Sequence, residues 1–178
     1  MQQLYDQFKQ AATALSAEVY RTTDLAEAIS FCRQITSELN QPAVVGDSGP
    51  LTCHIGSSLP GVVMPCGRRE AARATLGIAQ YDLAIAETGT LVQDATSLSS
   101  RLAATLPPIH LALVPTSGLV PSLTDVFARL AQNPYQMPGF LAFVSGPSRT
   151  ADIERVLTIG VHGPERLIIL FIDRWERG

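Results

Sequence analysis

The run LIILFI, residues 167–172, decides the fold, because six consecutive apolar residues are typical of a strand buried on both faces of a sheet. Earlier runs of similar character lie at 140–144, 109–114 and 83–86, the last resumed at 91–92. Stretches with helical spacing of apolar residues separate these runs. We therefore predict an α/β protein of three layers, with helices on both sides of a mostly parallel sheet.

The N-terminal 40 residues are predicted to be helical. Apolar residues recur at helical spacing from Leu4 to Leu15 and again from Leu25 to Leu39. Thr23 or Asp24 would cap the second helix, and the run NQP at 40–42 ends it. No linker or repeat follows, so we expect one domain over 1–178, in which the helical segment 1–40 packs on an α/β core at 41–178.

Further elements complete the α/β core. The sequence predicts short strands at 43–46 and 62–65. It also predicts helices at 68–76, ended by Gly77; from Pro121 to Leu130; and at 151–159.

Composition excludes some classes of chemistry. The 13 basic and 16 acidic residues give a net charge of −3, which argues against a general nucleic-acid binder. Lys9 is the only lysine and lies in a polar segment, so lysine Schiff-base chemistry is not expected. Any fixed contact between a basic side chain and an anion would have to come from arginine.

Cysteine usage and hydropathy indicate a cytoplasmic protein. Residues 1–15 lack the apolar core of a signal peptide, and no apolar run approaches the roughly 18 residues of a membrane span. Cys32, Cys53 and Cys66 cannot all pair with each other, which favours reduced thiols. The spacing of Cys53, His54 and Cys66 fits no standard zinc site, so no metal is predicted.

The motif AETGT at 86–90 follows a predicted strand. Glu87 would be a strand-end carboxylate acting as nucleophile, base or hydrogen-bond acceptor, with Gly89 allowing close approach and two threonines offering hydroxyls. The alternative is a solvated glutamate in an ordinary turn.

The motif SGPSRTAD at 145–152 joins a strand to a predicted helix. Free N–H groups at such a helix start, together with Ser148, Arg149 and Thr150, would form an anion site. Plain helix capping by Ser148 or Thr150 is an equal alternative.

The histidines carry weaker signals. His162, between Gly160 and Gly163, is either an acid–base group or a structural turn residue, whereas His110 is expected in the core. The sequence contains no GxSxG, HExxH, GxGxxG or P-loop motif.

Four separated motifs together resemble the LUD-domain family, in its lactate utilization protein C branch. They occur in the family's order at 84–92, at 101 with 106–110, at 145–154 and at 160–164. The resemblance runs from Gly77 to the C-terminus, and the chain is similar to a short version of the family. The residues QYD at 80–82 and Gln93 depart mildly from the family pattern.

The resemblance implies a fold like that of glucosamine-phosphate deaminases, ribose-phosphate isomerases and CoA transferases. It also implies a role in bacterial oxidation of L-lactate to pyruvate beside iron–sulfur partner proteins. Three scattered cysteines are too few for a cluster in this chain, and no cofactor is predicted.

Three functions follow as hypotheses: an accessory or anion-binding subunit of lactate utilization, which we favour; an enzyme on a phosphosugar or a CoA or acyl substrate with Glu87 as base or nucleophile; and a purely structural interaction module. The catalytic candidates are Glu87 and His162. The candidate ligand-binding residues are Thr88, Gly89, Thr90, Arg101, Gly146, Ser148, Arg149 and Thr150.

Overall fold

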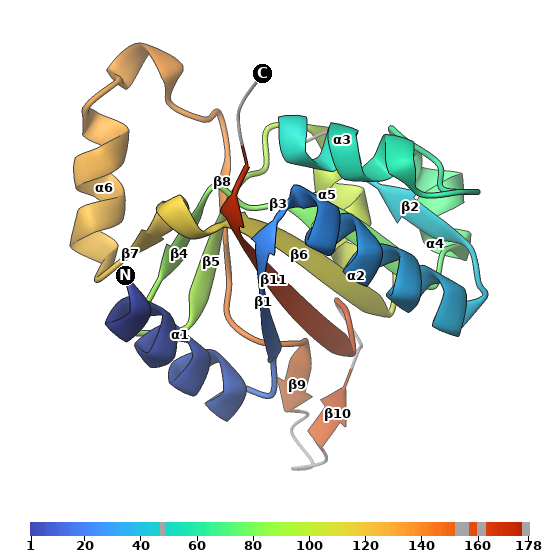
Figure 1. Cartoon of the computed structure of the whole chain (residues 1–178), viewed down its shortest axis with the longest axis horizontal. Coiled ribbons are helices and arrows are strands. Elements are labelled where there is room, and N and C mark those ends of the chain that lie inside the picture. The colour runs from blue at the N-terminus through green and yellow to red at the C-terminus, as the bar shows by residue number, and fades with distance from the viewer. Residues whose placement is uncertain (47–48, 152–156, 160–162, 176–178) are drawn as a thin grey trace.

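A five-stranded, all-parallel sheet forms the centre of the molecule (Figure 1). The computed structural model describes residues 1–46, 49–151, 157–159 and 163–175, and at 136, 149–151 and 157–159 it describes the backbone alone. The strand order is β1 (Glu18–Asp24), β11 (Arg166–Arg174), β6 (Ile109–Pro115), β3 (Leu76–Gln80) and β2 (Ala43–Val45). The predicted α/β class is confirmed, and the strands predicted at 43–46, 109–114 and 167–172 lie in this sheet. The strands predicted at 83–86 and 140–144 lie in a second, mixed sheet instead.

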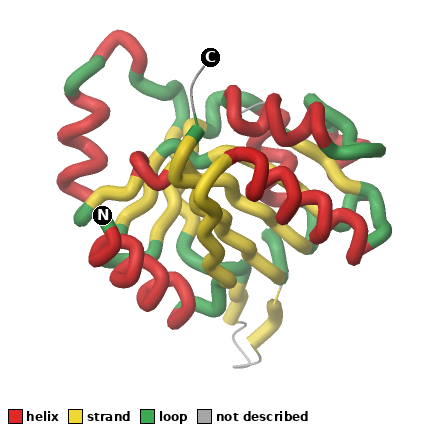
Figure 2. Tube along the Cα trace, viewed as in Figure 1, coloured by secondary structure: helices red, strands yellow, loops and turns green. Residues whose placement is uncertain are grey.

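Helices α2 (Leu25–Leu39) and α3 (Pro50–Ser58) cover one face of the parallel sheet (Figures 1 and 2). The other face is covered by α1 (Gln2–Ala14), α4 (Arg68–Arg73), α5 (Leu98–Thr105) and a second sheet. Alternate residues of β11 point to these two sides: Ile168 and Leu170 pack under α2 and α3, and Ile169 and Phe171 under α1. This double coverage explains why the run at 167–172 contains no polar residue.

The second sheet is mixed and has four strands. Its order is β7 (Leu119–Val120), β4 (Leu83–Ile85), β5 (Thr90–Asp94) and β8 (Leu141–Val144). Helix α6 (Leu123–Ala131) packs on the outer side of this sheet through Val126 and Leu130. Short 3₁₀ turns lie at Thr116–Gly118 (η1) and Pro134–Gln136 (η2), and β9 (Arg149–Ala151) pairs antiparallel with β10 (Leu157–Ile159).

The N-terminal segment contains a strand that the sequence prediction missed. Both predicted helices are present, and Asp24 caps the second by accepting a 3.0 Å hydrogen bond from the Glu27 N–H. Between them, residues 18–24 form β1, so the prediction of a wholly helical segment over 1–40 is wrong. β1 is an edge strand with exposed polar side chains, and its sequence therefore lacks the apolar run of a central strand.

Gly77 lies inside β3 and does not end a helix, because α4 stops at Arg73. A Cβ at Gly77 would overlap the Ala103 carbonyl, so this glycine lets α5 approach the sheet closely. The predicted strand at 62–65 is reduced to one bridge between Val63 and Val44. Pro121 precedes the capping residue Ser122 and is not in the first helical turn.

The predicted helix at 151–159 is wrong at both of its ends, and residues 152–156 lie outside the described residues. Ala151 ends β9 and Leu157–Ile159 form β10, and these strands pair with each other. Pairing between the two strands satisfies backbone groups that a helix would bond internally, so local helix propensity does not decide this segment. Along the part of the chain that is described, no helix combines the length and apolar character needed to cross a membrane.

Candidate functional site

The turn between β4 and β5 holds the first predicted motif. Residues 86–89 form this turn, and Gly89 adopts a φ of 63°. A Cβ at Gly89 would overlap the backbone N of Ala12 in α1. Both the left-handed conformation and the close approach of α1 therefore require glycine here.

Hydroxyl groups join this turn to the second predicted motif. Thr88 donates a 2.7 Å hydrogen bond to Thr90, and Thr90 shares a 2.8 Å hydrogen bond with Ser145. Thr90 is buried, while Thr88 and Ser145 are exposed. The structure thus brings together residues 55 positions apart in the sequence. The result is a short chain of hydroxyls that reaches the surface at both ends.

Gly146 fixes the second motif against the same helix. Its φ is 73°, and a Cβ there would lie 2.6 Å from the Leu15 carbonyl oxygen at the end of α1. Gly146 and Gly89 therefore both pack against α1 and its last residues. Close backbone packing, which the sequence could not show, holds the two loops side by side.

Glu87 is exposed and lies in the turn, beyond the end of β4. Its Oε1 accepts a 3.1 Å hydrogen bond from the N–H of Leu123, the first residue of α6. A carboxylate at this position favours the positive end of the helix. The bond comes from the backbone of the same chain, and an exposed glutamate in a turn agrees with the alternative of an ordinary turn residue. The catalytic role of Glu87 stays a prediction.

The segment after Gly146 departs from the predicted anion site. The Ser148 N–H donates to the Pro164 carbonyl at 2.8 Å, and Arg149 and Thr150 lie in β9. The argument from free N–H groups at a helix start does not apply, because the described residues there form a strand. The side chains of Arg149 and Thr150, and all of His162, lie outside the described residues.

Arg101 is placed away from the hydroxyl chain. Its guanidinium carbon lies 5.6 Å from the centre of the Phe140 ring, a cation–π contact. Phe140 precedes β8 and Ser145 follows it, so the full strand separates Arg101 from the hydroxyls. Its ligand-binding role stays a prediction without a geometric link to the other candidates.

A second polar group, missed by the sequence reasoning, lies at the carboxyl end of β3. Gln80 accepts a 3.0 Å hydrogen bond from the Leu51 N–H at the start of α3 and donates a 2.9 Å bond to Asp82. Gln93 donates to the Gln80 carbonyl at 3.4 Å. Both glutamines are almost fully buried. Ligands of open parallel sheets bind at such strand ends. The sequence feature that could have revealed this group is a polar residue at the end of an apolar strand.

His110 is a core residue, as expected. Its Nδ1–H donates to the Gly77 carbonyl at 2.9 Å, so Nε2 accepts the 3.0 Å hydrogen bond from the Tyr81 hydroxyl. Burial lowers the pKa of His110 to about 4, and the ring is neutral near pH 7. This histidine links β6 to β3 and has no access to solvent.

The cysteines form no metal centre among the residues that the structure describes. Cys32 and Cys66 are buried and Cys53 is exposed, and no disulfide joins any of these three described cysteines. Burial raises the pKa of Cys32 to about 12, which makes this thiol unreactive. No group of histidine, cysteine and acidic side chains that could hold a metal occurs in the described parts of the chain.

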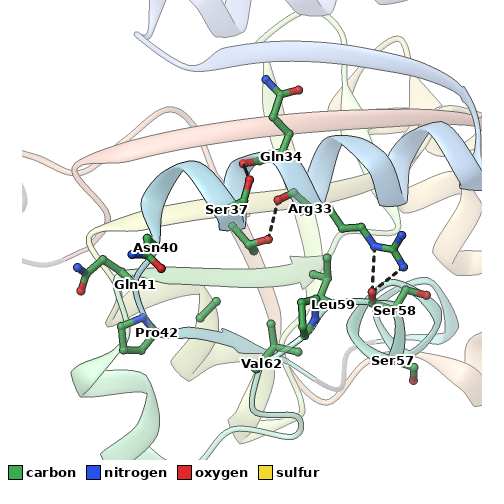
Figure 3. Close-up of a pocket in the computed structure, with 14 residues that line it drawn as sticks. Arg33, Gln34, Ser37, Asn40, Gln41, Pro42, Ser57, Ser58, Leu59 and Val62 are labelled. Carbon is green, nitrogen blue, oxygen red and sulfur yellow. Dashed lines mark hydrogen bonds between the residues drawn. The ribbon is translucent and has the colours of Figure 1, made fainter.

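An open depression of about 1040 Å³ lies between the C-terminal half of α2 and the end of α3 (Figure 3). Arg33 reaches across it and donates two hydrogen bonds, of 3.1 and 3.0 Å, to the Ser58 carbonyl. This depression belongs to the α2 and α3 side of the sheet, opposite α1 and the hydroxyl chain. None of the candidate residues lines it.

The fold and site define an α/β protein with a parallel central sheet and a hydroxyl-lined loop pair held by the N-terminal helix. The LUD domain model matches residues 63–172, more than half of the chain, and the chain belongs to this family. The family resemblance predicted from the four motifs is thereby confirmed.

Curated relatives match a little over half of the chain. Lactate utilization protein C of an Exiguobacterium species is 42% identical over 108 residues, which are 59% of this chain and 47% of that protein. Lactate utilization protein C of Bacillus subtilis is 33% identical over 108 residues, 59% of this chain and 45% of that protein. The match therefore spans about half the length of these relatives.

The crystal structure of a DUF162 family protein from Deinococcus radiodurans has the same fold. Its TM-score to this chain is 0.69 with 20% sequence identity, and the match covers 96% of each chain. At that identity the likeness concerns the fold alone.

Proposed function

We propose that this chain is an accessory or anion-binding subunit in bacterial L-lactate utilization, the oxidation of L-lactate to pyruvate with iron–sulfur partner proteins. Identity of 33–42% to proteins named Lactate utilization protein C supports the pathway. The proposed ligand is a small carboxylate or phosphate anion. We further propose that the fold is related to those of glucosamine-phosphate deaminases, ribose-phosphate isomerases and CoA transferases.

The hydrogen bond between Thr90 and Ser145 carries the anion-binding part of the proposal. It joins two motifs of the family resemblance at one place on the surface. Serine and threonine hydroxyls can each donate one hydrogen bond to a carboxylate or phosphate oxygen. In this proposal Thr90 holds the two loops together. Because Thr88 donates its one proton to Thr90, Thr90 can donate to Ser145, and the exposed Ser145 hydroxyl then donates to the ligand.

The enzyme alternative receives less support from the geometry. Covalent or base catalysis by Glu87 would favour a carboxylate shielded from water and aimed at a substrate. Glu87 is instead exposed and hydrogen-bonded to the first residue of α6. Likeness of fold to known enzymes is analogy only. We therefore propose binding in preference to catalysis.

A thermal-shift titration tests ligand binding. Lactate, pyruvate, inorganic phosphate and CoA are each added, and a true ligand raises the melting temperature with concentration as RT ln(1 + [L]/Kd) predicts. Thr90→Val should abolish that shift. Thr22→Val is the matched control, because Thr22 is equally buried but bonds the Phe171 carbonyl in the other sheet. If none of the four compounds shifts the wild-type melting temperature, the anion-binding proposal fails.

A genetic experiment tests the pathway independently. Deleting the gene in its host should prevent growth on L-lactate and leave growth on glucose intact. Returning the wild-type gene should restore growth on L-lactate. Affinity purification from lactate-grown cells should recover proteins that carry iron–sulfur clusters. Normal growth of the deletion strain on L-lactate would refute the role in lactate utilization.

A further inference from the structure

Large apolar side chains are exposed along one continuous segment, from α6 to β8. Six of the most exposed lie within 21 residues: Leu123, Phe127, Tyr135, Met137, Phe140 and Phe143, with exposed fractions of 43–100%. Leu98 on α5 adds a seventh at 58%. Aromatic residues and methionine are the types enriched at protein–protein interfaces. In Figure 1 this segment runs from α6 through the outer arch into β8.

β8 is an edge strand whose second edge is open in the described structure. It pairs with β5 from Val144 to Leu141, and the mixed sheet ends there. Residues 137–144, MPGFLAFV, carry no charge. Proteins usually protect exposed edges with charged residues or prolines inside the strand, and β8 has neither. An apolar edge of this kind is suited to pairing with another strand.

Several of the exposed side chains adjoin this edge. Phe143 lies opposite Val92 on the side of the sheet that α6 covers in part. Phe140 lies at the start of the strand, where its ring contacts Arg101, and Leu98 is one helical turn before that arginine. The edge is thus flanked by apolar groups on both sides of the sheet.

The exposed apolar area approaches what a dimer interface needs. Four aromatic side chains, Phe127, Tyr135, Phe140 and Phe143, expose 45–100% of their surface, which at roughly 150–250 Å² each is on the order of 500 Å². Leu98, Leu123 and Met137 add to this area. A standard interface buries about 800 Å² on each partner, and monomers rarely expose apolar patches of more than a few hundred Å².

We propose that β8 and its flanking apolar residues form the interface between two copies of this chain. Two β8 strands would pair antiparallel across a twofold axis and join the two mixed sheets. An uncharged, apolar edge is complementary to itself, because neither copy brings a like charge against the other. Apolar interfaces of this type are typical of homodimers.

Sedimentation of the purified full chain tests the proposal. At tens of micromolar the wild type should have twice the chain mass of 19.1 kDa. Phe143→Lys should weaken association at least about tenfold and give the monomer mass, as expected for a charge placed in a buried apolar contact. Leu106→Lys is the matched control, since Leu106 is equally exposed but lies at the far end of α5, and it should stay dimeric.

Cross-linking locates the contact. In a Cys53→Ser background the remaining thiols are buried, so a short bis-maleimide should link two copies through Ala142→Cys and not through Leu106→Cys. Near-ultraviolet circular dichroism confirms that each variant is folded. A wild type that is monomeric at these concentrations overturns the proposal. A dimer that survives Phe143→Lys and is not linked through position 142 also overturns it and assigns association to another surface.

Discussion

β11 and β8 are both built from apolar residues, yet they differ in what covers them. Every residue from 167 to 172 is fully buried, because helices or strands pack on both faces and both edges of β11. In β8 no side chain is fully buried, Phe143 is 45% exposed, and one edge is open in the described structure. An apolar run therefore predicts a strand, but coverage by the rest of the fold decides whether that strand stabilises the core or offers a surface.

The largest expected effect comes from truncating the core of β11. Phe171 is fully buried, and its ring makes edge contacts with Phe8 and Tyr5 at 5.0 and 5.5 Å. Phe171→Ala should lower the free energy of unfolding by about 3–5 kcal/mol, because it leaves a cavity. Urea denaturation measures this. Phe127→Ala, on a half-exposed ring over the mixed sheet, should cost about 1 kcal/mol or less. Equal losses of unfolding free energy in the two variants would contradict the conclusion that Phe171 is covered by the fold and Phe127 is not.

Acid should destabilise the parallel sheet through His110. The folded pKa is lowered to about 4 from 6.5, so the unfolded chain binds more protons between these values. Stability from the neutral ring is present above pH 6.5 and is lost as the pH falls towards 4, by about 3 kcal/mol. His110→Gln should flatten this part of the stability profile, measured by urea denaturation at each pH. An unchanged slope of stability against pH in His110→Gln would contradict the assignment to His110.

Packing of the mixed sheet on α1 should depend on Gly89. Gly89→Ala should cost about 2–3 kcal/mol, because a side chain is strained at positive φ and its Cβ would overlap the α1 backbone. Gly61→Ala is the matched control: Gly61 has a φ of 74° with open space around it, so only the backbone cost of about 1 kcal/mol remains. Thermal denaturation distinguishes the two. If Gly89→Ala loses no more stability than Gly61→Ala, close packing of α1 against the turn is contradicted.

The smallest effect is expected at Glu87. Glu87→Gln keeps an oxygen that can accept from the Leu123 N–H but removes the charge at the start of α6. The loss should be about 0.3–1 kcal/mol and should diminish in high salt. Denaturation at two ionic strengths measures it, with the exposed Glu165→Gln as control. A loss of several kcal/mol would show that Glu87 does more than hold α6.

Sequence reasoning located the central strands because burial on two faces leaves a readable apolar run, as in β6 and β11. β1 was missed because its only apolar residues are the adjacent Val19 and Tyr20, so neither an apolar run nor an alternation marks this edge strand in the sequence. β9 and β10 were missed because their helical pattern was weighed by itself, whereas the two short strands pair with each other and this pairing overrides helix propensity.

The candidate site was foreseen only in part. The two motifs could be named from residue types and spacing, but the meeting of Thr90 with Ser145 depends on the antiparallel register of β5 and β8. Gln80 and Gln93 gave a signal only as polar residues in apolar strands. Their burial, and the hydrogen bond of Gln80 to the start of α3, are tertiary facts.

The contacts of Gly89 and Gly146 with α1 indicate that the segment matched by the family model is smaller than the part of the chain that folds together. Both glycines lie within residues 63–172, which identify the family, but the backbone they touch lies in residues 11–15. β1 and β2, two of the five parallel strands, also lie before residue 63. An excised fragment limited to the recognised segment would expose one edge of β11, one edge of β3 and both glycine loops. Expression of that fragment should yield aggregated protein, which would show that residues 1–62 are as necessary to folding as the segment that the family model matches.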